Sequence, residues 1–166
     1  MILQPLFGEV FSNAPVNPEN KVSSDAPSKK HVCIDMGAEE FVEGRAHPMI
    51  DFSLRDMRIL QEARDPETAV VLIDVELGFG SNSDPAGQLV PVIRKAKGLA
   101  KEAGRYLAVV ASIVGTEEDF QGLARQEKAL SDARVLVMPS NAQATRVSAL
   151  IASGKKIEAI VSGRSD

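Results

Sequence analysis

The residues best suited to chemistry gather in a short polar segment between the first apolar run and the first amphipathic stretch. Arg45, His47 and Asp51 stand close together in the sequence, next to Pro48. An arginine can bind carboxylate or phosphate oxygens through two parallel hydrogen bonds, and a histidine exchanges protons near neutral pH. Arg45 and His47 are therefore the candidate catalytic residues. In the alternative interpretation, Arg45 pairs with a neighbouring glutamate and His47 packs at the start of a helix.

A second candidate is a glycine-rich turn, in which Gly78 and Gly80 permit close approach of the backbone to a ligand. Ser81 and Asn82 follow at the expected start of a helix, where free N–H groups can bind an anion. No Gly-Lys-Ser/Thr sequence follows, and the third glycine of the dinucleotide fingerprint is missing. Asp84 competes with a phosphate for the same amides, so a plain strand-to-helix turn is the alternative.

Two further strand-to-helix junctions complete the predicted binding surface. Gly115 and Thr116 follow one apolar run, and Ser140 and Asn141 follow the next. Ligands of open parallel sheets bind beyond the carboxyl ends of the strands, so these residues are expected to face a common substrate or anion. Three acidic residues come directly after Thr116, and they favour helix capping over phosphate binding at that junction.

Three carboxylates, Asp35, Asp74 and Glu76, stand at the ends of two apolar runs. A metal site or a buried carboxylate pair is conceivable there, but acids at strand ends often cap loops, and we expect no bound metal. Cys33 lies inside an apolar run and is expected to be an unreactive core residue.

These residues must be positioned by an alternation of strands and helices. Four apolar runs predict strands at residues 31–35, 69–75, 106–113 and 133–138, and a weaker run predicts a fifth at 157–161. Amphipathic or capped stretches predict helices at 49–63, 85–103, 116–130 and 140–153. Near-continuous apolar strands between helices are typical of a sheet buried on both faces. We therefore expect a three-layer α/β domain with a mostly parallel sheet of four to five strands.

Residues 1–30 differ from the rest of the chain, because they carry four of the nine prolines among Asn, Ser and Lys residues. Proline restricts its own backbone and that of the preceding residue. This segment is therefore expected to be an extended arm or linker, or an ordered arm lying on the domain. The domain itself is expected to cover residues 31–153, and residues 154–166 are expected to form a tail that includes the fifth strand.

The composition excludes several function classes. One Cys cannot form an internal disulfide or a cysteine-rich zinc site, and two His leave little room for a histidine metal site. A net charge of −4 and an aromatic content of 4% disfavour nucleic-acid binding. No apolar run approaches the roughly 20 residues that cross a bilayer, so a soluble cytoplasmic protein without membrane contact is expected.

Several motifs resemble the FdrA proteins, which are similar to the α subunit of succinyl-CoA synthetase. The longest, at residues 44–51, reads Gly-Arg-x-His-Pro-Met-Ile-Asp, and Ile-Asp-Met-Gly precedes it at 34–37. Leu-Ile-Asp-Val at 72–75 runs into Gly-Phe-Gly at 78–80, and Gly-Thr-Glu stands at 115–117. The resemblance covers nearly the whole globular part of the chain.

The resemblance implies a flavodoxin-like CoA-ligase domain of an acyl-CoA synthetase-like enzyme. Larger members of the family carry CoA-binding domains on the N-terminal side, so residues 8–30 are expected to be a linker from such domains. A CoA-binding or catalytic partner subunit is then expected to supply CoA, and no cofactor is firmly predicted on this chain. Succinyl-CoA synthetases carry a phosphorylated histidine after the corresponding third strand, whereas residues 112–116 contain no histidine.

Two alternatives stay open. FdrA-like proteins are also linked to oxamate carbamoyltransferase, a reaction of allantoin breakdown that needs no phosphohistidine. Arg45, Ser81, Asn82 and Thr116 would then bind the acyl or carbamoyl substrate. In the other alternative the domain is a non-catalytic assembly module, and association with a second copy of itself is also open. A flavin or receiver domain is disfavoured, because loop aromatics are few and the fourth run leads into Pro-Ser where a receiver has a lysine.

Overall fold

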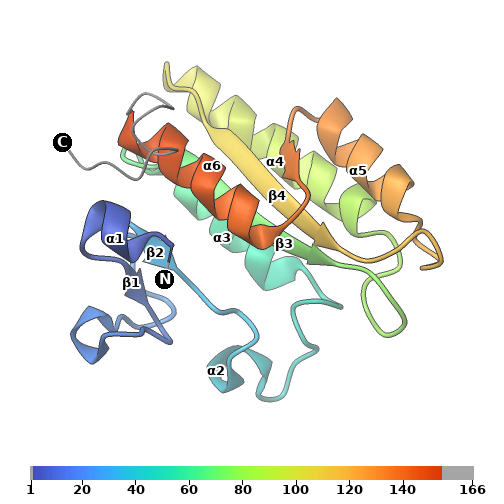
Figure 1. The fold of residues 1–166 in the computed structure, drawn as a ribbon, viewed down its shortest axis with the longest axis horizontal. Coiled ribbons are helices and arrows are strands. Elements are labelled where there is room, and N and C mark those ends of the chain that lie inside the picture. The colour runs from blue at the N-terminus through green and yellow to red at the C-terminus, as the bar shows by residue number, and fades with distance from the viewer. Residues whose placement is uncertain (1, 155–166) are drawn as a thin grey trace.

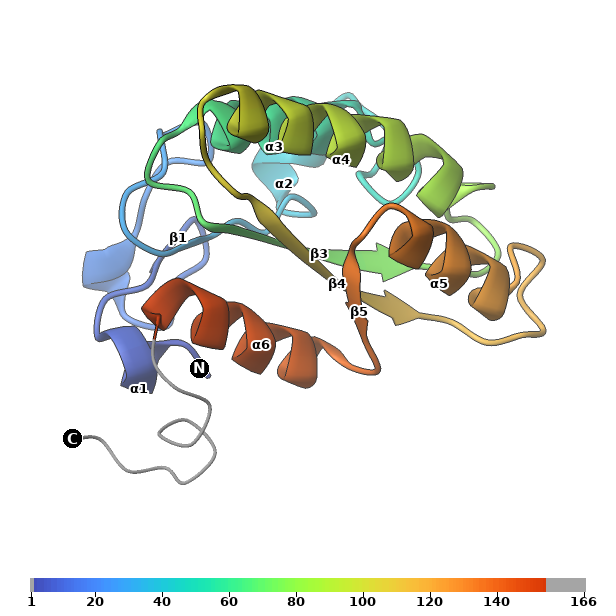
Figure 2. The same ribbon diagram turned by 90° about the horizontal axis from the view of Figure 1, so that it is seen from above.

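A three-stranded parallel sheet forms the middle of the domain in the computed structural model, which describes residues 2–154 (Figure 1). Its strands lie in the order β3 (Val70–Glu76), β4 (Ala108–Val114) and β5 (Leu136–Met138). One face is covered by α3 (Ser53–Arg64), α4 (Pro85–Glu102) and α5 (Leu123–Asp132), and α6 (Asn141–Ser153) lies on the other (Figure 2). The parallel α/β architecture expected from the sequence is therefore confirmed.

The core forms where β4 meets α4. The middle of β4, including Val110 and Ala111, has no exposed side chain surface. On α4, Leu89, Ile93 and Ala96 recur at helical spacing and are fully buried against the sheet. Because β4 has a partner strand on each side and helices on both faces, it takes only apolar or small residues.

The strand expected at 31–35 is shorter and belongs to a second sheet. Strand β2 (Val32–Cys33) pairs in parallel with β1 (Phe11–Ser12), so the five described strands divide between a two-stranded and a three-stranded sheet. Asn13 extends this pairing, because its side chain accepts from the Asp35 N–H at 2.9 Å and donates to the Asp35 carbonyl at 2.8 Å. Cys33 is exposed in this small sheet, so the expectation of a core cysteine was wrong.

Two helices begin later than expected because the preceding residues form capped turns. Helix α3 starts at Ser53 rather than at residue 49, and the Asp51 carboxylate accepts from the Ser53 N–H at 2.9 Å. Helix α5 starts at Leu123 rather than at residue 116. The Asp119 carboxylate accepts from the Thr116 N–H at 2.6 Å, so this acidic residue closes a turn before the helix.

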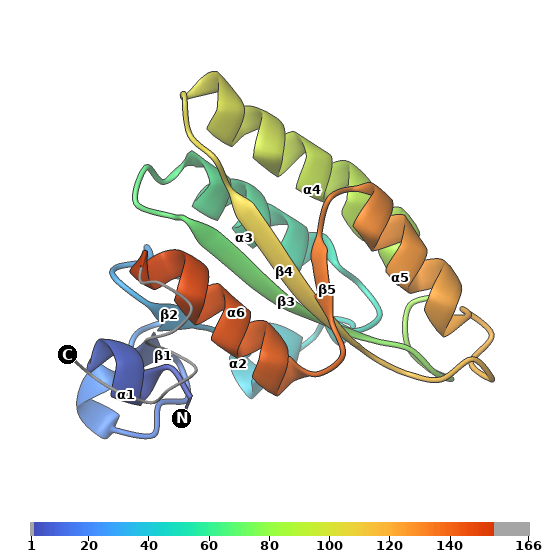
Figure 3. The ribbon, with the colours of Figure 1, turned by 45° about the horizontal axis from the view of Figure 1, so that its top comes forward.

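Residues 2–30 are folded as an arm that lies beside the end of α6 and the start of β3 (Figure 3). The arm contains α1 (Gln4–Phe7), β1 and the short 3₁₀ helix η1 (Pro18–Asn20), and α2 (Glu39–Val42) follows β2. The Phe7 ring stacks on the His31 ring with centroids 3.7 Å apart, and Phe11 is buried. These aromatic contacts hold the arm together internally.

Polar contacts with α3 tether the arm to the domain. Arg58 forms a largely buried ion pair with Glu62, with Nε and Oε1 2.5 Å apart. The same guanidinium donates to the Ser24 carbonyl at 3.1 Å and to Ser28 Oγ at 2.8 Å, and Ser28 donates to Glu62 at 2.8 Å. One cation on α3 therefore fixes two points of the arm.

The expected strand at 157–161 lies outside the described residues. Within residues 2–154, no helix has both the length and the apolar character needed to cross a membrane.

Replacing Arg58 by Leu is expected to lower the free energy of unfolding by about 2 kcal/mol, because Glu62 and the Ser24 carbonyl lose their shared donor. The arm should also be cleaved faster by a protease. Urea denaturation and limited proteolysis measure these effects. The control is Arg64→Leu on the exposed side of the same helix, which should cost less than about 0.5 kcal/mol. Equal losses in the two variants would contradict the tether.

Candidate functional site

A fixed carboxylate lies near the carboxyl ends of β3 and β4, where α6 begins. Asp74 on β3 accepts hydrogen bonds from the Ser112 hydroxyl on β4 and, at 2.7 Å, from Asn141 Nδ2. Thr145, one turn further along α6, donates to Asn141 Oδ1 at 3.4 Å. Ser112 is only 1% exposed, so its buried hydroxyl is joined to the protein surface through the hydrogen bond to Asp74. Two strands and one helix therefore hold this carboxylate in place.

The first turn of α6 faces the same point. Ser140 caps the helix, because its Oγ accepts from the Gln143 N–H at 3.3 Å, as the Ser-x-x-Gln spacing predicts. The N-terminus of a helix carries a partial positive charge and favours a nearby anion. A carboxylate offers about four acceptor positions, and Asp74 uses two of them for Ser112 and Asn141. The remaining positions can accept N–H groups from a ligand.

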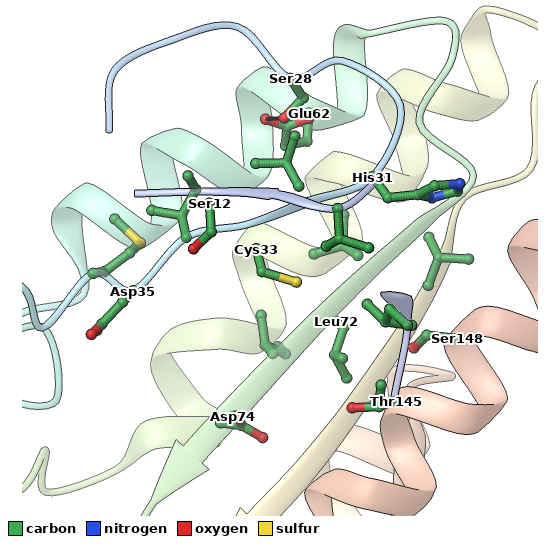
Figure 4. Close-up of a pocket in the computed structure, with 18 of the residues that line it drawn as sticks. Ser12, Ser28, His31, Cys33, Asp35, Glu62, Leu72, Asp74, Thr145 and Ser148 are labelled. Carbon is green, nitrogen blue, oxygen red and sulfur yellow. Dashed lines mark hydrogen bonds between the residues drawn. The ribbon is translucent and has the colours of Figure 1, made fainter. Parts of the chain in front are cut away.

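This cluster opens into a cavity of about 1230 Å³ between the arm, β3 and α6 (Figure 4). Asp74 and Asn141 line it, together with Asp35 and His47. Apolar residues, among them Leu72 of β3, line it as well. A few polar groups among apolar walls are a common arrangement in small-molecule sites.

Arg55 places a positive charge in the wall of the cavity. Its guanidinium stacks on the Phe52 ring, 3.7 Å from the centroid, and Nη1 donates to the Asp74 carbonyl at 3.0 Å. Nε and Nη2 are buried without a hydrogen-bond partner. Burial lowers the pKa of Arg55, opposed by the nearby Glu76, Asp56 and Asp74 carboxylates. Burial also raises the pKa of Asp56, whose Oδ1 lacks a partner as well.

The glycine-rich turn is braced from within the protein. Gln121 is fully buried, and its side chain donates to the carbonyls of Gly78 and Asn82 and to Ser81 Oγ, each at 3.0 Å. It also accepts from the Gly78 N–H at 3.2 Å. Asn82 is 5% exposed and donates to the Ile50 carbonyl at 2.9 Å. Gly78 and Gly80 have φ angles of 117° and 91°, which suit glycine.

The turn after β4 also serves packing. A Cβ on Gly115 would lie 2.6 Å from Leu77 Cβ, so only glycine allows these two strand ends to approach. Thr116 bonds to Asp119 through both its N–H and its hydroxyl. Gly115 and Thr116, like Gly78, Ser81 and Asn82, do not line the cavity described above.

The two catalytic candidates separate in the structure. His47 lines the cavity, and its Nδ1 accepts from the Met49 N–H at 3.2 Å. A Cβ on Gly37 would lie 3.0 Å from His47 Nε2, so the ring packs on the turn after β2. Arg45 is exposed, does not line the cavity, and its side chain has no hydrogen-bond or ion-pair partner within residues 2–154.

Of the predicted site residues, the structure therefore brings His47 and Asn141 to one cavity, together with Asp74. In residues 2–154 no three His, Cys, Asp or Glu side chains gather in a way that could hold a metal ion. The sequence reasoning missed Gln121 and Arg55. Gln121 has no distinctive spacing, whereas Arg55 follows the motif at residues 44–51 by four positions.

Comparison with known proteins identifies a family and a relative. The model of the CoA-ligase family matches residues 18–151. The curated "Uncharacterized protein YahF" of Escherichia coli (strain K12) is 41% identical over 134 residues, which are 81% of this chain and 26% of that protein. The chain thus spans about a quarter of the length of this relative.

Replacing Gln121 by Met is expected to lower the free energy of unfolding by about 2–3 kcal/mol, because the Gly78 N–H and the Asn82 carbonyl lose their partner and Ser81 Oγ loses one of two. Urea denaturation measures this loss. Gln61→Met, at an exposed position of α3, is the matched control and should stay within about 0.5 kcal/mol of the parent. A loss as small as that of the control would show that the turn does not depend on Gln121.

The Asp56 carboxyl should make stability depend on pH. Its pKa is raised above the ordinary value of 3.8 in the folded protein, so the folded state binds this proton more tightly than the unfolded chain does. Stability therefore falls as the pH rises from 3.8 through the folded-state pKa. Asp56→Asn is therefore expected to be more stable than the parent near pH 7, and the difference should close as the pH falls towards 3.8. Denaturation at several pH values measures it, with the exposed Asp132→Asn as control. A difference that does not change with pH would contradict this account.

Proposed function

The chain belongs to the CoA-ligase family, and from this premise we propose that it is the substrate-binding domain of an FdrA-type, acyl-CoA synthetase-like enzyme. In this proposal a partner subunit supplies the CoA-binding domains. The domain holds the small acyl or carboxylate substrate and presents it to CoA on the partner.

The observation that carries the proposal is the cluster of Asp74, Ser112 and Asn141, of which Asp74 and Asn141 line the cavity. It combines a fixed hydrogen-bond acceptor, an amide, and the positive end of α6. Ligands of α/β domains bind at this edge of the sheet, beyond the carboxyl ends of the strands. Arg55 adds a cation within the same wall, which suits a substrate that carries an anionic group.

The lack of a histidine in residues 112–122 supports a domain without its own phosphohistidine. The turn that would carry one is occupied by Thr116 and Asp119, which bond to each other. His47 lines the cavity but packs on the turn after β2. If the reaction uses a phosphorylated histidine, the proposal assigns that group to the partner.

The acceptor capacity of Asp74 favours a second candidate, a subunit of an oxamate carbamoyltransferase. Oxamate and carbamoyl phosphate each combine an amide NH₂ with anionic oxygens. The amide can donate to the free positions of the Asp74 carboxylate, while the anionic oxygens face the start of α6. A plain dicarboxylate such as succinate has no N–H group to offer Asp74, so the choice of ligand separates the two candidates.

Isothermal titration calorimetry with succinate, oxamate, carbamoyl phosphate and CoA tests both candidates. The chain is expected to bind at least one of the three small ligands and to give no heat with CoA alone. Asn141→Ala should weaken the binding about tenfold, because one amide contact is lost and Asp74 loses its support. Preference for oxamate or carbamoyl phosphate over succinate would support the carbamoyltransferase.

The matched control is Gln143→Ala, which removes an exposed amide from the same turn of α6 and should leave affinity unchanged. Binding of CoA to the chain alone would contradict the assignment of CoA to a partner. Binding of a small ligand that is equally strong in Asn141→Ala would contradict the site, and heat with none of the four ligands would contradict a substrate-binding role.

A further inference from the structure

Two polar side chains that the proposed function leaves unused lie beside Gly37 in the wall of the cavity. His47, Gly37 and Asp35 all line this cavity, and the side chains of His47 and Asp35 are exposed in it. A Cβ on Gly37 would lie 3.0 Å from His47 Nε2 and 3.3 Å from Asp35 Oδ1. One small group of a ligand can therefore contact both side chains.

The surroundings of His47 fix which of its ring nitrogens carries the proton. The Met49 N–H donates to Nδ1 at 3.2 Å, so Nδ1 is an acceptor. In the neutral ring the proton is therefore on Nε2. Nε2 has no hydrogen-bond partner in residues 2–154, so its N–H group is available to a ligand as a donor.

The Asp35 carboxylate offers the complementary group. Its Oδ1 accepts from the Gly37 N–H at 2.9 Å and so closes a turn after β2. Oδ2 accepts no hydrogen bond from the part of the chain that the structure describes. A carboxylate oxygen accepts hydrogen bonds and cannot donate them. The wall of the cavity thus presents a donor on His47 next to an acceptor on Asp35.

The turn that carries His47 is held by the glycine-rich segment after β3. The His47 carbonyl accepts from the N–H groups of Ile50 and Asp51 at 2.8 and 3.1 Å. The Asn82 N–H donates to the Met49 carbonyl at 2.8 Å, and the Asn82 side chain donates to the Ile50 carbonyl at 2.9 Å. Because these bonds form without a ligand, Nε2 is already positioned when a ligand arrives.

We propose that Asp35 and His47 bind a primary amide group of a ligand in the cavity. The amide oxygen accepts from His47 Nε2, and the amide NH₂ donates to Asp35 Oδ2. A carboxylate in place of the amide has no N–H group to donate and brings a second negative charge to Asp35. The inference rests on the proposed function only in taking the cavity as the substrate site.

The amide site also bears on the choice between the two candidate functions. Oxamate and carbamoyl phosphate each carry one amide, so a cavity that holds both molecules needs two amide acceptors. Asp74 is one carboxylate of the cavity with free acceptor positions, and Asp35 is a second. Figure 4 shows both side chains among those that line the cavity.

Isothermal titration calorimetry tests the amide site by comparing oxamate with oxalate, and carbamoyl phosphate with inorganic phosphate. In Asp35→Asn, the asparagine oxygen still accepts from the Gly37 N–H, but an NH₂ donor replaces the free oxygen. At least one amide ligand should bind about tenfold more weakly, while its amide-free counterpart stays within about twofold or binds more tightly. The control is Glu39→Gln, at an exposed position that does not line the cavity, and it should bind as the parent does.

Two substitutions of His47 separate its donor from its role in the turn. Asparagine keeps an acceptor for the Met49 N–H but cannot reach the position of Nε2, so His47→Asn should weaken the same amide ligand about tenfold. Glutamine reaches that position with an N–H group, so His47→Gln should bind this ligand more tightly than His47→Asn does.

Gly37→Ala tests the same contact from the backbone side. The φ of Gly37 is not positive, so alanine fits the backbone, but its methyl group presses on Nε2 and should weaken binding of the amide ligand. Gly98→Ala on α4 is the matched control, because a Cβ there meets no atom within 4 Å, and it should bind as the parent does. Urea denaturation checks that all variants are folded.

Three outcomes would overturn the amide site. In the first, Asp35→Asn and His47→Asn leave the binding of both amide ligands unchanged. In the second, these variants weaken amide-containing and amide-free ligands equally. In the third, the parent binds succinate but neither amide ligand. If Asn141→Ala still weakens binding in these cases, the proposed function stands without the amide site, whereas a parent that binds none of the small ligands contradicts both.

Discussion

The register between β3 and β4 is the constraint on which the rest of the structure depends. It sets Asp74 opposite Ser112, so the carboxylate of one strand meets the hydroxyl of the next. Because side chains alternate between the two faces of a sheet, a shift of one residue would turn Asp74 towards α3 and α4, away from Asn141. The same register places Ile73 and Val75 in the core, so the packing of the sheet and the geometry of the cluster are fixed together.

The elements that the sequence predicted well are those whose signals are local. Helix α4 begins at Pro85 as expected and has a continuous apolar stripe, and α6 begins one residue after its predicted cap at Ser140. The expectation that polar site residues lie near the strand ends depends only on the direction of parallel strands, and the binding role of these residues stays a prediction.

The features that were not predicted depend on distant contacts. Part of the apolar run at 31–35 pairs with Phe11 and Ser12, which lie in a proline-rich segment without a recognisable strand pattern. Cys33 is exposed because this pairing places it in the small sheet and not in the main one. The hydrogen bonds between Gln121 and Gly78 join residues that are 43 positions apart in the chain. Pattern and propensity describe neighbours in sequence, so side chains such as Gln121 and Arg58, which bond across the fold, leave no signal there.

The tether of the arm to α3 has a consequence for how a ligand reaches the cavity. The arm is held to the domain by the contacts of Arg58, whereas the sheet is held by its core, so the two should open with very different free energies. Release of the arm then uncovers the cavity while β3, β4 and α6 stay folded. A ligand that binds only after this release has an apparent affinity reduced by the fraction of open molecules, and its association rate has the opening of the arm as a ceiling. A ligand that meets Asp74 and Asn141 where they are already exposed escapes this ceiling.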